Sequence, residues 1–330
     1  MGAGPLADGA ALGHDARRVT EIPVGGWKQI LARMGRALME DDIWTHCASV
    51  GFFGFLSVFP IMAVFVLLYG LWNPASDMAT QIEQLRPFVP AVAFDVLEGR
   101  LMELASNSTS DLTIGLAIST LVAMWTGSRG TNSLIGLLNV AYHEIHARGF
   151  LRRAGLAIAI TLAALLALIV ALVALAAIPL LVRGLPFPDT VAQIALWGRW
   201  PVLAGMIFWA FLFLYRFAPK RRKARVRWLV PGAALGMALW LALSWLFSIY
   251  VERVVDYSST FGALSAGVVL MLWIYYSAFV IAIGAVFNAE IEYQTAVDTT
   301  VGRPKPRGRR GAVVADEGPP LEEHAEQPAR

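Results

Sequence analysis

The chain has 330 residues, of which 57% are hydrophobic and 15% are charged, with a formal net charge of +3. In soluble domains, about a quarter of the residues are charged. The lower charged fraction of this chain and its repeated apolar runs of roughly 18 or more residues exclude an ordinary soluble protein and indicate an all-α, polytopic membrane protein. The single cysteine, Cys47, excludes an intramolecular disulfide framework.

The amino-terminal part divides into two segments. Residues 1–22 are rich in Gly, Ala and Asp and are expected to be disordered. Over residues 24–40, apolar residues recur at helical spacing with basic residues between them, which predicts an amphipathic helix. Two interpretations of this helix remain open: it lies in the membrane interface, or it is a short solvated helix packed on the membrane domain.

Six apolar segments are long enough to cross a bilayer. They lie at about residues 47–72, 112–140, 156–182, 200–217, 228–250 and 261–288. The sequence therefore predicts six transmembrane helices within a membrane domain of residues 23–295. The third segment is almost entirely Ala, Leu, Ile and Val, so we expect it at the periphery, facing lipid.

Proline and glycine predict where these helices bend or approach one another. Pro60 removes a backbone hydrogen bond within the first segment, and Ser57 is expected to help satisfy the freed carbonyl. Gly232 and Gly236 of the fifth segment have the GxxxG spacing that suits close helix packing. Further positions assigned to kinking or packing are Gly127, Gly130 and Gly262.

The loops differ strongly in charge. Residues 73–111 form the longest loop, which is acidic and has a spacing of apolar residues that predicts one or two amphipathic helices folded over the membrane domain. Residues 296–330 are rich in Pro, Gly and charge, so we expect a disordered tail.

Lys and Arg are distributed unevenly between the two sides of the predicted spans. One side has 21 of them, in segments 1–46, 141–154, 216–228 and 289–330, whereas the intervening loops have five. By the positive-inside rule, both termini are predicted to be cytoplasmic and the acidic loop to lie on the outer side.

The second predicted span contains a polar run from Trp125 to Ser133, with Arg129 near its centre. A charge at bilayer depth is costly unless it faces protein or water, so Arg129 is a candidate functional residue. Two interpretations are open: Arg129 ties helices together through backbone carbonyls or through Glu290, or it contacts an anionic substrate such as a phosphate or a lipid headgroup. The candidate polar residues are Arg129, Asn132, Ser128, Asn139, Glu290 and Ser57.

The residue pattern does not favour a catalytic site. Phosphodiester hydrolysis needs metal-binding carboxylates, a His pair or a comparable acid–base set, and the predicted spans contain no His cluster. His143 and His146 do not form an HExxH motif, and the chain has no P-loop. We therefore expect no enzymatic activity, no metal, no cofactor and no nucleic-acid partner. The basic run at residues 220–227 is interpreted either as a topology signal or as a contact for anionic headgroups.

Several stretches occur in the order seen in one family of membrane proteins. They are ASVGFFGFLSVFP, MWTGSRGTNSLIGLLNVAY, LYRFAP, PGAALGMALW and FGALSAGVVLMLWIYYSAFVIAIGAVFNAE. From about residue 27 to residue 294 the chain resembles the YihY/BrkB family. The resemblance implies an inner-membrane protein with six spans, for which an old ribonuclease BN label is regarded as mistaken and for which movement of lipids or lipopolysaccharide precursors has been suggested.

The chain differs from this family at two positions. Phe261 stands where Tyr is frequent, and Val286 stands where many relatives have a carboxylate. Glu290 is then the remaining carboxylate near the inner end of the sixth span.

Two classes of function are compatible with these features. The first is a transporter that translocates a lipid or another anionic envelope component across the bacterial inner membrane, with a cavity lined by spans one, two and six. The second is a non-catalytic scaffold that recruits envelope protein partners through its outer loop and basic tail. A connected polar cavity reaching Arg129 would favour transport, and a solid bundle with an exposed apolar patch on residues 73–111 would favour the scaffold. Membrane lipids are the expected partners.

Overall fold

The computed structural model describes residues 12–39, 41–72, 109–144, 149–184, 189–254 and 258–318. Its longer helices are α2 (Val24–Ala37), α3 (Asp41–Trp72), α6 (Thr109–Ala141), α7 (Phe150–Gly184), α8 (Asp189–Phe217), α9 (Val226–Val254) and α10 (Ser258–Gln294), and the short elements are η1 (Val19–Glu21) and α11 (Val313–Glu317). This confirms the all-α prediction. The helices predicted within loop 73–111 fall almost entirely outside the described residues.

Each predicted span lies within one long helix of the structure. Among the described helices, α3, α7, α8, α9 and α10 have the length and the apolar composition needed to cross a membrane. Helix α6 has 33 residues and is long enough, but its polar run around Arg129 makes it less apolar than the others. The protein is therefore a polytopic membrane protein, and a sixth span at α6 stays a prediction.

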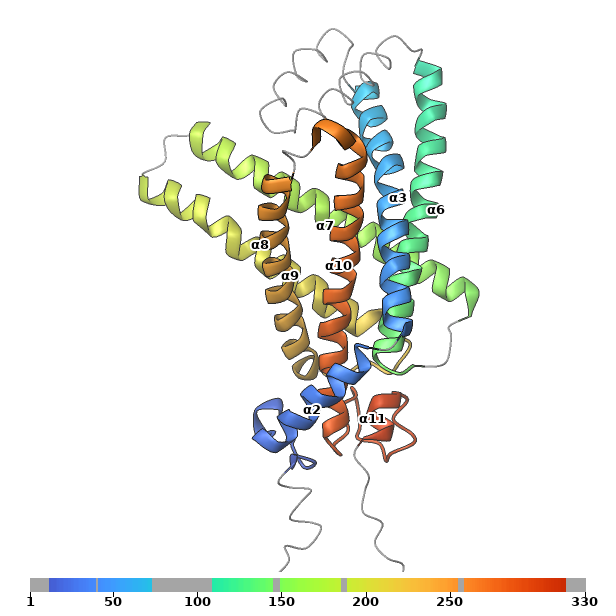
Figure 1. The fold of residues 1–330 in the computed structure, drawn as a ribbon, viewed down its shortest axis with the longest axis vertical. Coiled ribbons are helices and arrows are strands. Elements are labelled where there is room, and N and C mark those ends of the chain that lie inside the picture. The colour runs from blue at the N-terminus through green and yellow to red at the C-terminus, as the bar shows by residue number, and fades with distance from the viewer. Residues whose placement is uncertain are drawn as a thin grey trace, which may run out of the picture.

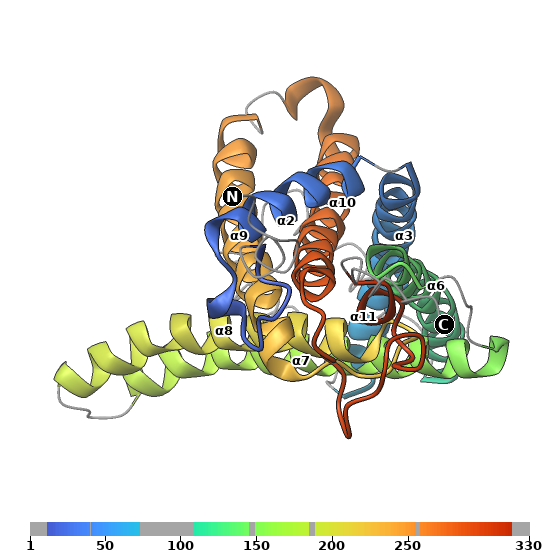
Figure 2. The ribbon, with the colours of Figure 1, turned by 90° about the horizontal axis from the view of Figure 1, so that it is seen from below.

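Helix α10 occupies the middle of the molecule and contacts α2, α3, α6, α9 and α11. Figure 1 shows α3, α6, α9 and α10 running roughly along the long axis, with α7 and α8 crossing them obliquely. Seen from below, α7 and α8 lie side by side and extend well beyond the other helices (Figure 2). Most described side chains of α7 over residues 158–170 are exposed, in agreement with the expected lipid-facing helix.

Glycines permit the closest helix contacts around α10. A Cβ atom on Gly232 would collide with the Gly284 carbonyl of α10 and with the side chain of Asn288. On the opposite side of α10, a Cβ atom on Gly54 of α3 would lie 2.8 Å from a methyl carbon of Ile274. The backbones of α9 and α3 can thus approach the central helix because these positions have no side chain.

The other positions assigned to packing have different neighbours. A Cβ on Gly236 would lie 3.0 Å from the Tyr215 hydroxyl of α8, one on Gly127 would lie 3.2 Å from Thr161 of α7, and one on Gly130 would lie 3.5 Å from the Gly54 nitrogen of α3. Gly262 belongs to α10, but its surroundings lie outside the described residues.

Pro60 lies inside α3, as expected, but Ser57 has another role than the one predicted for it. The Ser57 hydroxyl donates to the carbonyl of Gly54 at 2.7 Å. The carbonyl that loses its partner four residues before Pro60 is that of Leu56, so Ser57 bonds a different one. Bonding to the preceding turn is a usual choice for a serine within a helix, because a carbonyl there is within reach of its short side chain.

Residues 12–39 and 295–318, which we name the cap, fold together over one end of the bundle, where α2 and α11 lie (Figure 1). Hydrogen bonds join the two parts: the Thr295 hydroxyl donates to the Ala16 carbonyl at 2.7 Å, and the Ala296 nitrogen donates to the His14 carbonyl at 2.7 Å. Gln294, the last residue of α10, also donates to the Leu12 carbonyl at 2.9 Å. Disorder was expected for residues 1–22 and 296–330, and the structure differs for residues 12–22 and 296–318. Composition measures only local apolar content, whereas this order comes from contacts between the two ends of the chain.

Buried polar groups hold the carboxyl-terminal part of the cap. The Arg310 guanidinium donates to the carbonyls of Lys305, Ala315 and Ala296 at 3.1, 2.7 and 2.8 Å. Asp298 accepts from the Thr300 nitrogen and hydroxyl and from the Lys305 nitrogen. Burial acts to raise the pKa of Asp298, but these hydrogen bonds and the nearby Arg310 outweigh it and lower that pKa. The charges of this segment are therefore used internally instead of keeping it in solvent.

Candidate functional site

The buried polar side chains of the central helix gather at its capped end. Asn288, Glu290, Glu292 and Gln294 lie in the last two turns of α10, and all four are buried. Buried polar groups are costly unless they are paired. Each of these side chains has a partner from another part of the chain, and together they fix the cap and the α8–α9 loop to the bundle.

An ion pair between Arg221 and Glu292 lies at the centre of this end. Nη2 of Arg221 is 2.6 Å from Oε2 of Glu292, and the two side chains are 2% and 0% exposed. The Thr299 hydroxyl donates to the same carboxylate oxygen at 2.7 Å, and the guanidinium lies 4.7 Å from the centre of the Tyr142 ring. Burial acts to lower the pKa of Arg221, but Glu292 and Tyr142 outweigh it and raise that pKa, so the guanidinium stays charged.

Glu290 pairs with α2 and not with Arg129, which corrects the expected partnership. Nε of Arg33 is 2.5 Å from Oε2 of Glu290, and Nη2 of Arg33 donates to Gln294 at 2.7 Å. The Arg33 guanidinium also lies 5.1 Å from the centre of the Tyr293 ring. The amphipathic helix is thus packed on the end of α10 through Arg33 and through its buried apolar residue Ile30, in agreement with the second of its two interpretations.

Asn288 joins α10 to the first turns of α9. Its Oδ1 accepts from the Gly232 nitrogen at 2.7 Å, and its Nδ2 donates to the Leu229 carbonyl at 3.1 Å. Pro231 precedes Gly232 and interrupts the backbone hydrogen bonds of α9. The asparagine side chain therefore supplies hydrogen bonds where α9 is irregular and where it approaches α10 most closely.

Arg129 does not belong to this buried network. Its side chain is exposed, and no hydrogen bond or ion pair joins it to another of the described residues; its guanidinium lies 5.6 Å from the centre of the Trp125 ring. The same outward face of α6 carries Ile118, Leu121 and Trp125, which are 58%, 68% and 56% exposed. Arg129 therefore lies on an exposed, mostly apolar face of α6 and does not tie the described helices together.

The remaining candidate residues have local or inter-helix partners. Asn132 accepts from Nε of Arg153 in α7 at 3.1 Å, and its backbone carbonyl accepts from Nη2 of the same arginine at 3.0 Å. Asn139 accepts from the Lys220 nitrogen at 2.8 Å, and the Ser128 hydroxyl donates to the Trp125 carbonyl at 2.9 Å. The polar run on α6 is therefore divided between an outward-facing arginine and an inward-facing asparagine.

The exposure of Arg129 predicts the behaviour of a variant. Arg129→Ala is expected to change the free energy of unfolding by no more than about 0.5 kcal/mol, as for other surface exchanges. Arg153→Ala removes both hydrogen bonds to Asn132 and is expected to cost about 1–3 kcal/mol. Thermal unfolding of the detergent-solubilised proteins compares the two. An Arg129→Ala loss as large as that of Arg153→Ala would make Arg129 a structural tie.

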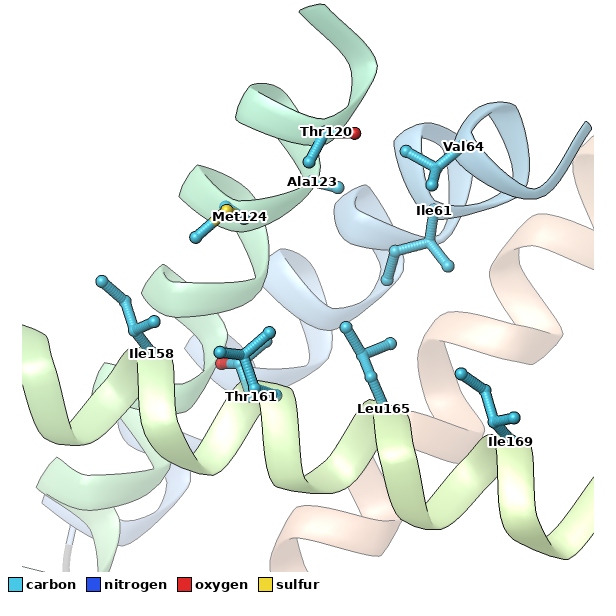
Figure 3. Close-up of a pocket in the computed structure, with 10 residues that line it drawn as sticks. Ile61, Val64, Thr120, Ala123, Met124, Ile158, Thr161, Leu165 and Ile169 are labelled. Atoms are coloured by element: carbon cyan, nitrogen blue, oxygen red, sulfur yellow. The ribbon is translucent and has the colours of Figure 1, made fainter. Parts of the chain in front are cut away.

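An apolar groove opens between three helices at the middle of the bundle. It has a volume of about 230 Å³ and is lined by Ile61, Val64, Thr120, Ala123, Met124, Ile158, Thr161, Leu162, Leu165 and Ile169. Figure 3 shows the side chains of α7 and those of α3 and α6 pointing toward one another across it, where α7 diverges from the other two helices. The Thr161 hydroxyl donates to the Ala157 carbonyl at 2.8 Å and shares a 2.7 Å hydrogen bond with Thr131. Its polar atom is satisfied, so the groove presents a hydrocarbon-like surface.

Comparison with known proteins places the chain among membrane proteins. Residues 34–309 match the family described as "Virulence factor BrkB". The chain belongs to the BrkB family. This BrkB-family chain is 31% identical over 252 residues to the "Putative ribonuclease-like protein YfkH" of Bacillus subtilis. The aligned region covers 73% of the chain and 87% of that relative.

Shorter matches join the BrkB-family chain to proteins named UPF0761 membrane proteins. One from Idiomarina loihiensis is 30% identical over 92 residues, 28% of this chain and 31% of that protein. Another from Xanthomonas oryzae pv. oryzae is 36% identical over 78 residues, 24% of this chain and 18% of that protein. No solved structure matches the chain.

The ribonuclease-like name of the Bacillus relative raises the question of whether this chain has a metal centre. In the part of this BrkB-family chain that the structure describes, no group of three or more His, Cys, Asp or Glu side chains is placed to hold a metal ion. His143 lies two residues after the end of α6 in a left-handed conformation with φ of 55°, and His146 lies outside the described residues. The described site is thus made of ion pairs and amide contacts.

Sequence reasoning did not identify Arg33, Arg153, Arg221 or Glu292 as site residues. One available signal was the i, i+4 spacing of Asn288 and Glu292, which puts two polar side chains on one face of an otherwise apolar helix. Arg221 belongs to the basic run at residues 220–227, which the sequence indicates as a topology signal or a contact for anionic headgroups, and nothing in the local sequence distinguishes its buried side chain from those of its neighbours.

Proposed function

We propose that this BrkB-family protein transports or translocates a lipid, or another anionic component of the envelope, across the bacterial inner membrane. The observation that carries the proposal is the apolar groove between α3, α6 and α7. A site lined by hydrocarbon side chains and opening between diverging membrane helices suits an acyl chain, which gains no hydrogen bonds and needs only apolar contact.

The neighbouring residues of α6 supply a complementary polar contact. Met124 lines the groove, the next residue is the exposed Trp125, and Arg129 follows one turn later. An arginine can bind a phosphate through two parallel hydrogen bonds. In this proposal the acyl chains occupy the groove and the headgroup passes along the outer face of α6. From the sequence, a connected polar cavity lined by spans one, two and six and reaching Arg129 would favour transport. The groove differs from such a cavity, since it is apolar, lies between spans one, two and three, and does not have Arg129 among its lining residues.

A vesicle assay tests this function. The protein is reconstituted into vesicles of phosphatidylcholine and phosphatidylglycerol with a fluorescent phosphatidylglycerol, and dithionite quenches the label in the outer leaflet only. Wild type is expected to move label from the inner leaflet and thus to increase the quenched fraction, and Ala123→Trp, which fills the groove, is expected to abolish most of this increase. Ala163→Trp adds the same side chain to an exposed position of α7 that does not line the groove and is expected to behave like wild type.

Two outcomes would count against the proposal. A wild-type quenched fraction equal to that of protein-free vesicles would contradict lipid translocation. Equal transport by Ala123→Trp, Ala163→Trp and wild type would remove the groove from the transport path.

The cap supports a second candidate, a non-catalytic scaffold that recruits envelope partners. Residues 301–306 are all exposed, yet Asp298 and Arg310 fix the segment on either side of them by buried hydrogen bonds. An ordered, exposed loop is a suitable docking surface because it loses little conformational entropy on binding. Loss of partner recruitment after exchanges in residues 301–306, with lipid movement absent in wild type, would favour this role.

The orientation of the chain is part of the proposal. The 21 Lys and Arg residues on one side against five on the other support cytoplasmic termini. Reporter fusions that are active only in the cytoplasm are therefore expected to be active after residues 150, 222 and 300 and inactive after residues 90, 190 and 256. A reversed result at any two of these sites would contradict the proposed topology.

A further inference from the structure

A basic recess lies at the capped end of the bundle, apart from the apolar groove. It has a volume of about 580 Å³ and is lined by Gly149, Arg152, Leu156, Lys220, Arg221 and Gly311. These residues come from the beginning of α7, from the loop between α8 and α9, and from the cap. Three of the described lining residues are cationic and none is acidic.

The nearby carboxylates each have at least one partner, although Oε1 of Glu292 is buried without a hydrogen-bond partner among the described residues. Glu292 binds Arg221 and Thr299, as described above, and Glu144 accepts from the Val313 nitrogen at 3.1 Å. Nη1 of Arg221 is buried, but it has no hydrogen-bond partner among the described residues. Arg221 lines the recess, but its side chain is only 2% exposed, so the cationic side chains within reach of a ligand are those of Arg152 and Lys220.

Two further features favour an anion at this position. Helix α7 begins at Phe150, beside the recess, and has 35 residues, so its first turn adds a partial positive charge and free N–H groups. A Cβ atom on Gly149 would meet nothing within 4 Å, which shows open space at the helix start. Arg152 is exposed and can turn toward a ligand there.

The recess lies where the apolar helices begin or end, since α8 ends at Phe217 and α9 begins at Val226 on either side of its loop. Leu156 adds one apolar lining residue, a turn further along α7. This is the depth at which a membrane protein meets phosphate-bearing headgroups.

We propose that this recess binds a phosphate group, through Arg152, Lys220 and the first turn of α7. The phosphate belongs either to a lipid headgroup or to a soluble phosphate compound. The site is separate from the groove and does not depend on transport, because it uses different residues and requires only binding.

Binding to the full-length protein in a neutral detergent tests the proposal by isothermal titration calorimetry. Three probes are compared: inorganic phosphate, dioctanoyl phosphatidic acid, and dioctanoylglycerol, which has the same chains without phosphate. Arg152→Gln and Lys220→Gln are each expected to weaken binding of a phosphate probe by about tenfold, as for the loss of one charged hydrogen bond. Arg227→Gln removes one positive charge from the same basic run at an exposed position outside the recess, and it is expected to bind like wild type.

The outcomes separate the two sources of phosphate. Binding of phosphatidic acid alone supports a lipid headgroup, and binding of inorganic phosphate with similar affinity supports a soluble phosphate compound. The proposal is overturned if dioctanoylglycerol binds as well as phosphatidic acid, if no phosphate probe binds, or if Arg227→Gln weakens binding as much as Arg152→Gln. Failure of this site leaves the vesicle assay of the groove unaffected.

Discussion

Glu292→Gln is expected to lower the stability of the folded protein by about 3–5 kcal/mol, because removing the charge of one partner leaves the other buried and unpaired. Arg221 is 2% exposed and relies on this carboxylate, and Thr299 donates to the same oxygen. The thermal unfolding temperature of the purified protein in detergent, together with the folded yield, measures the effect.

Two variants control for this exchange. Glu317→Gln makes the same chemical change at an exposed position of α11 and is expected to have almost no effect. The double variant Arg221→Met with Glu292→Met removes both charges and is expected to be more stable than Glu292→Gln alone, since an apolar pair leaves no unpaired charge. If Glu292→Gln unfolds at the wild-type temperature, the ion pair does not hold the capped end together.

Gly232→Ala is expected to destabilise the protein by about 1–3 kcal/mol or more, the usual effect of overpacking. The added methyl group meets the Gly284 carbonyl and the Asn288 side chain, and neither a helix backbone nor a doubly hydrogen-bonded amide can move away easily. Helix α9 would have to shift from α10, and both hydrogen bonds of Asn288 would lengthen. Thermal unfolding in detergent gives the change in stability.

Gly155→Ala is the matched control for that exchange. Gly155 lies inside α7 with nothing within 4 Å of an added Cβ atom, and alanine is favoured over glycine in a helix by roughly 0.5–1 kcal/mol. This variant should therefore be as stable as wild type or slightly more stable. Equal losses for both variants would indicate that the contact between α9 and α10 is not as close as described.

Helices and their close contacts were predictable because their determinants are local. Apolar runs placed each predicted span inside one observed helix, and the four-residue spacing of Gly232 and Gly236 indicated a packed face. Gly232 does lie against α10, while Gly236 lies against α8. The identity of the contacting helix was not predictable, because a glycine pair specifies closeness and not a partner.

The partners of charged residues could not be predicted for the same reason. Arg33 and Glu290 are 257 residues apart in the sequence, and no periodicity connects α2 with the end of α10. Arg129 was expected to be tied to the bundle or to a substrate inside a cavity, since a charge within a span usually faces protein. The Arg129 side chain instead lies on the outward face of α6. The direction in which it points depends on how α6 is rotated in the assembled bundle, which the local sequence does not specify.

Helix α7 crosses α3, α6, α9 and α10 obliquely, so α7 and those helices cannot all be perpendicular to one bilayer (Figure 1). Its 35 residues extend over roughly 52 Å at 1.5 Å per residue, against a hydrocarbon core of about 30 Å. Tilting accommodates the excess, in agreement with its oblique course beside α3 and α10 in Figure 1. Lipids around the α7–α8 hairpin would therefore meet a wall of a different inclination from the wall formed by α3, α6, α9 and α10. We expect acyl chains between the two walls to splay or shorten, which would disturb the order of the lipid next to the proposed groove.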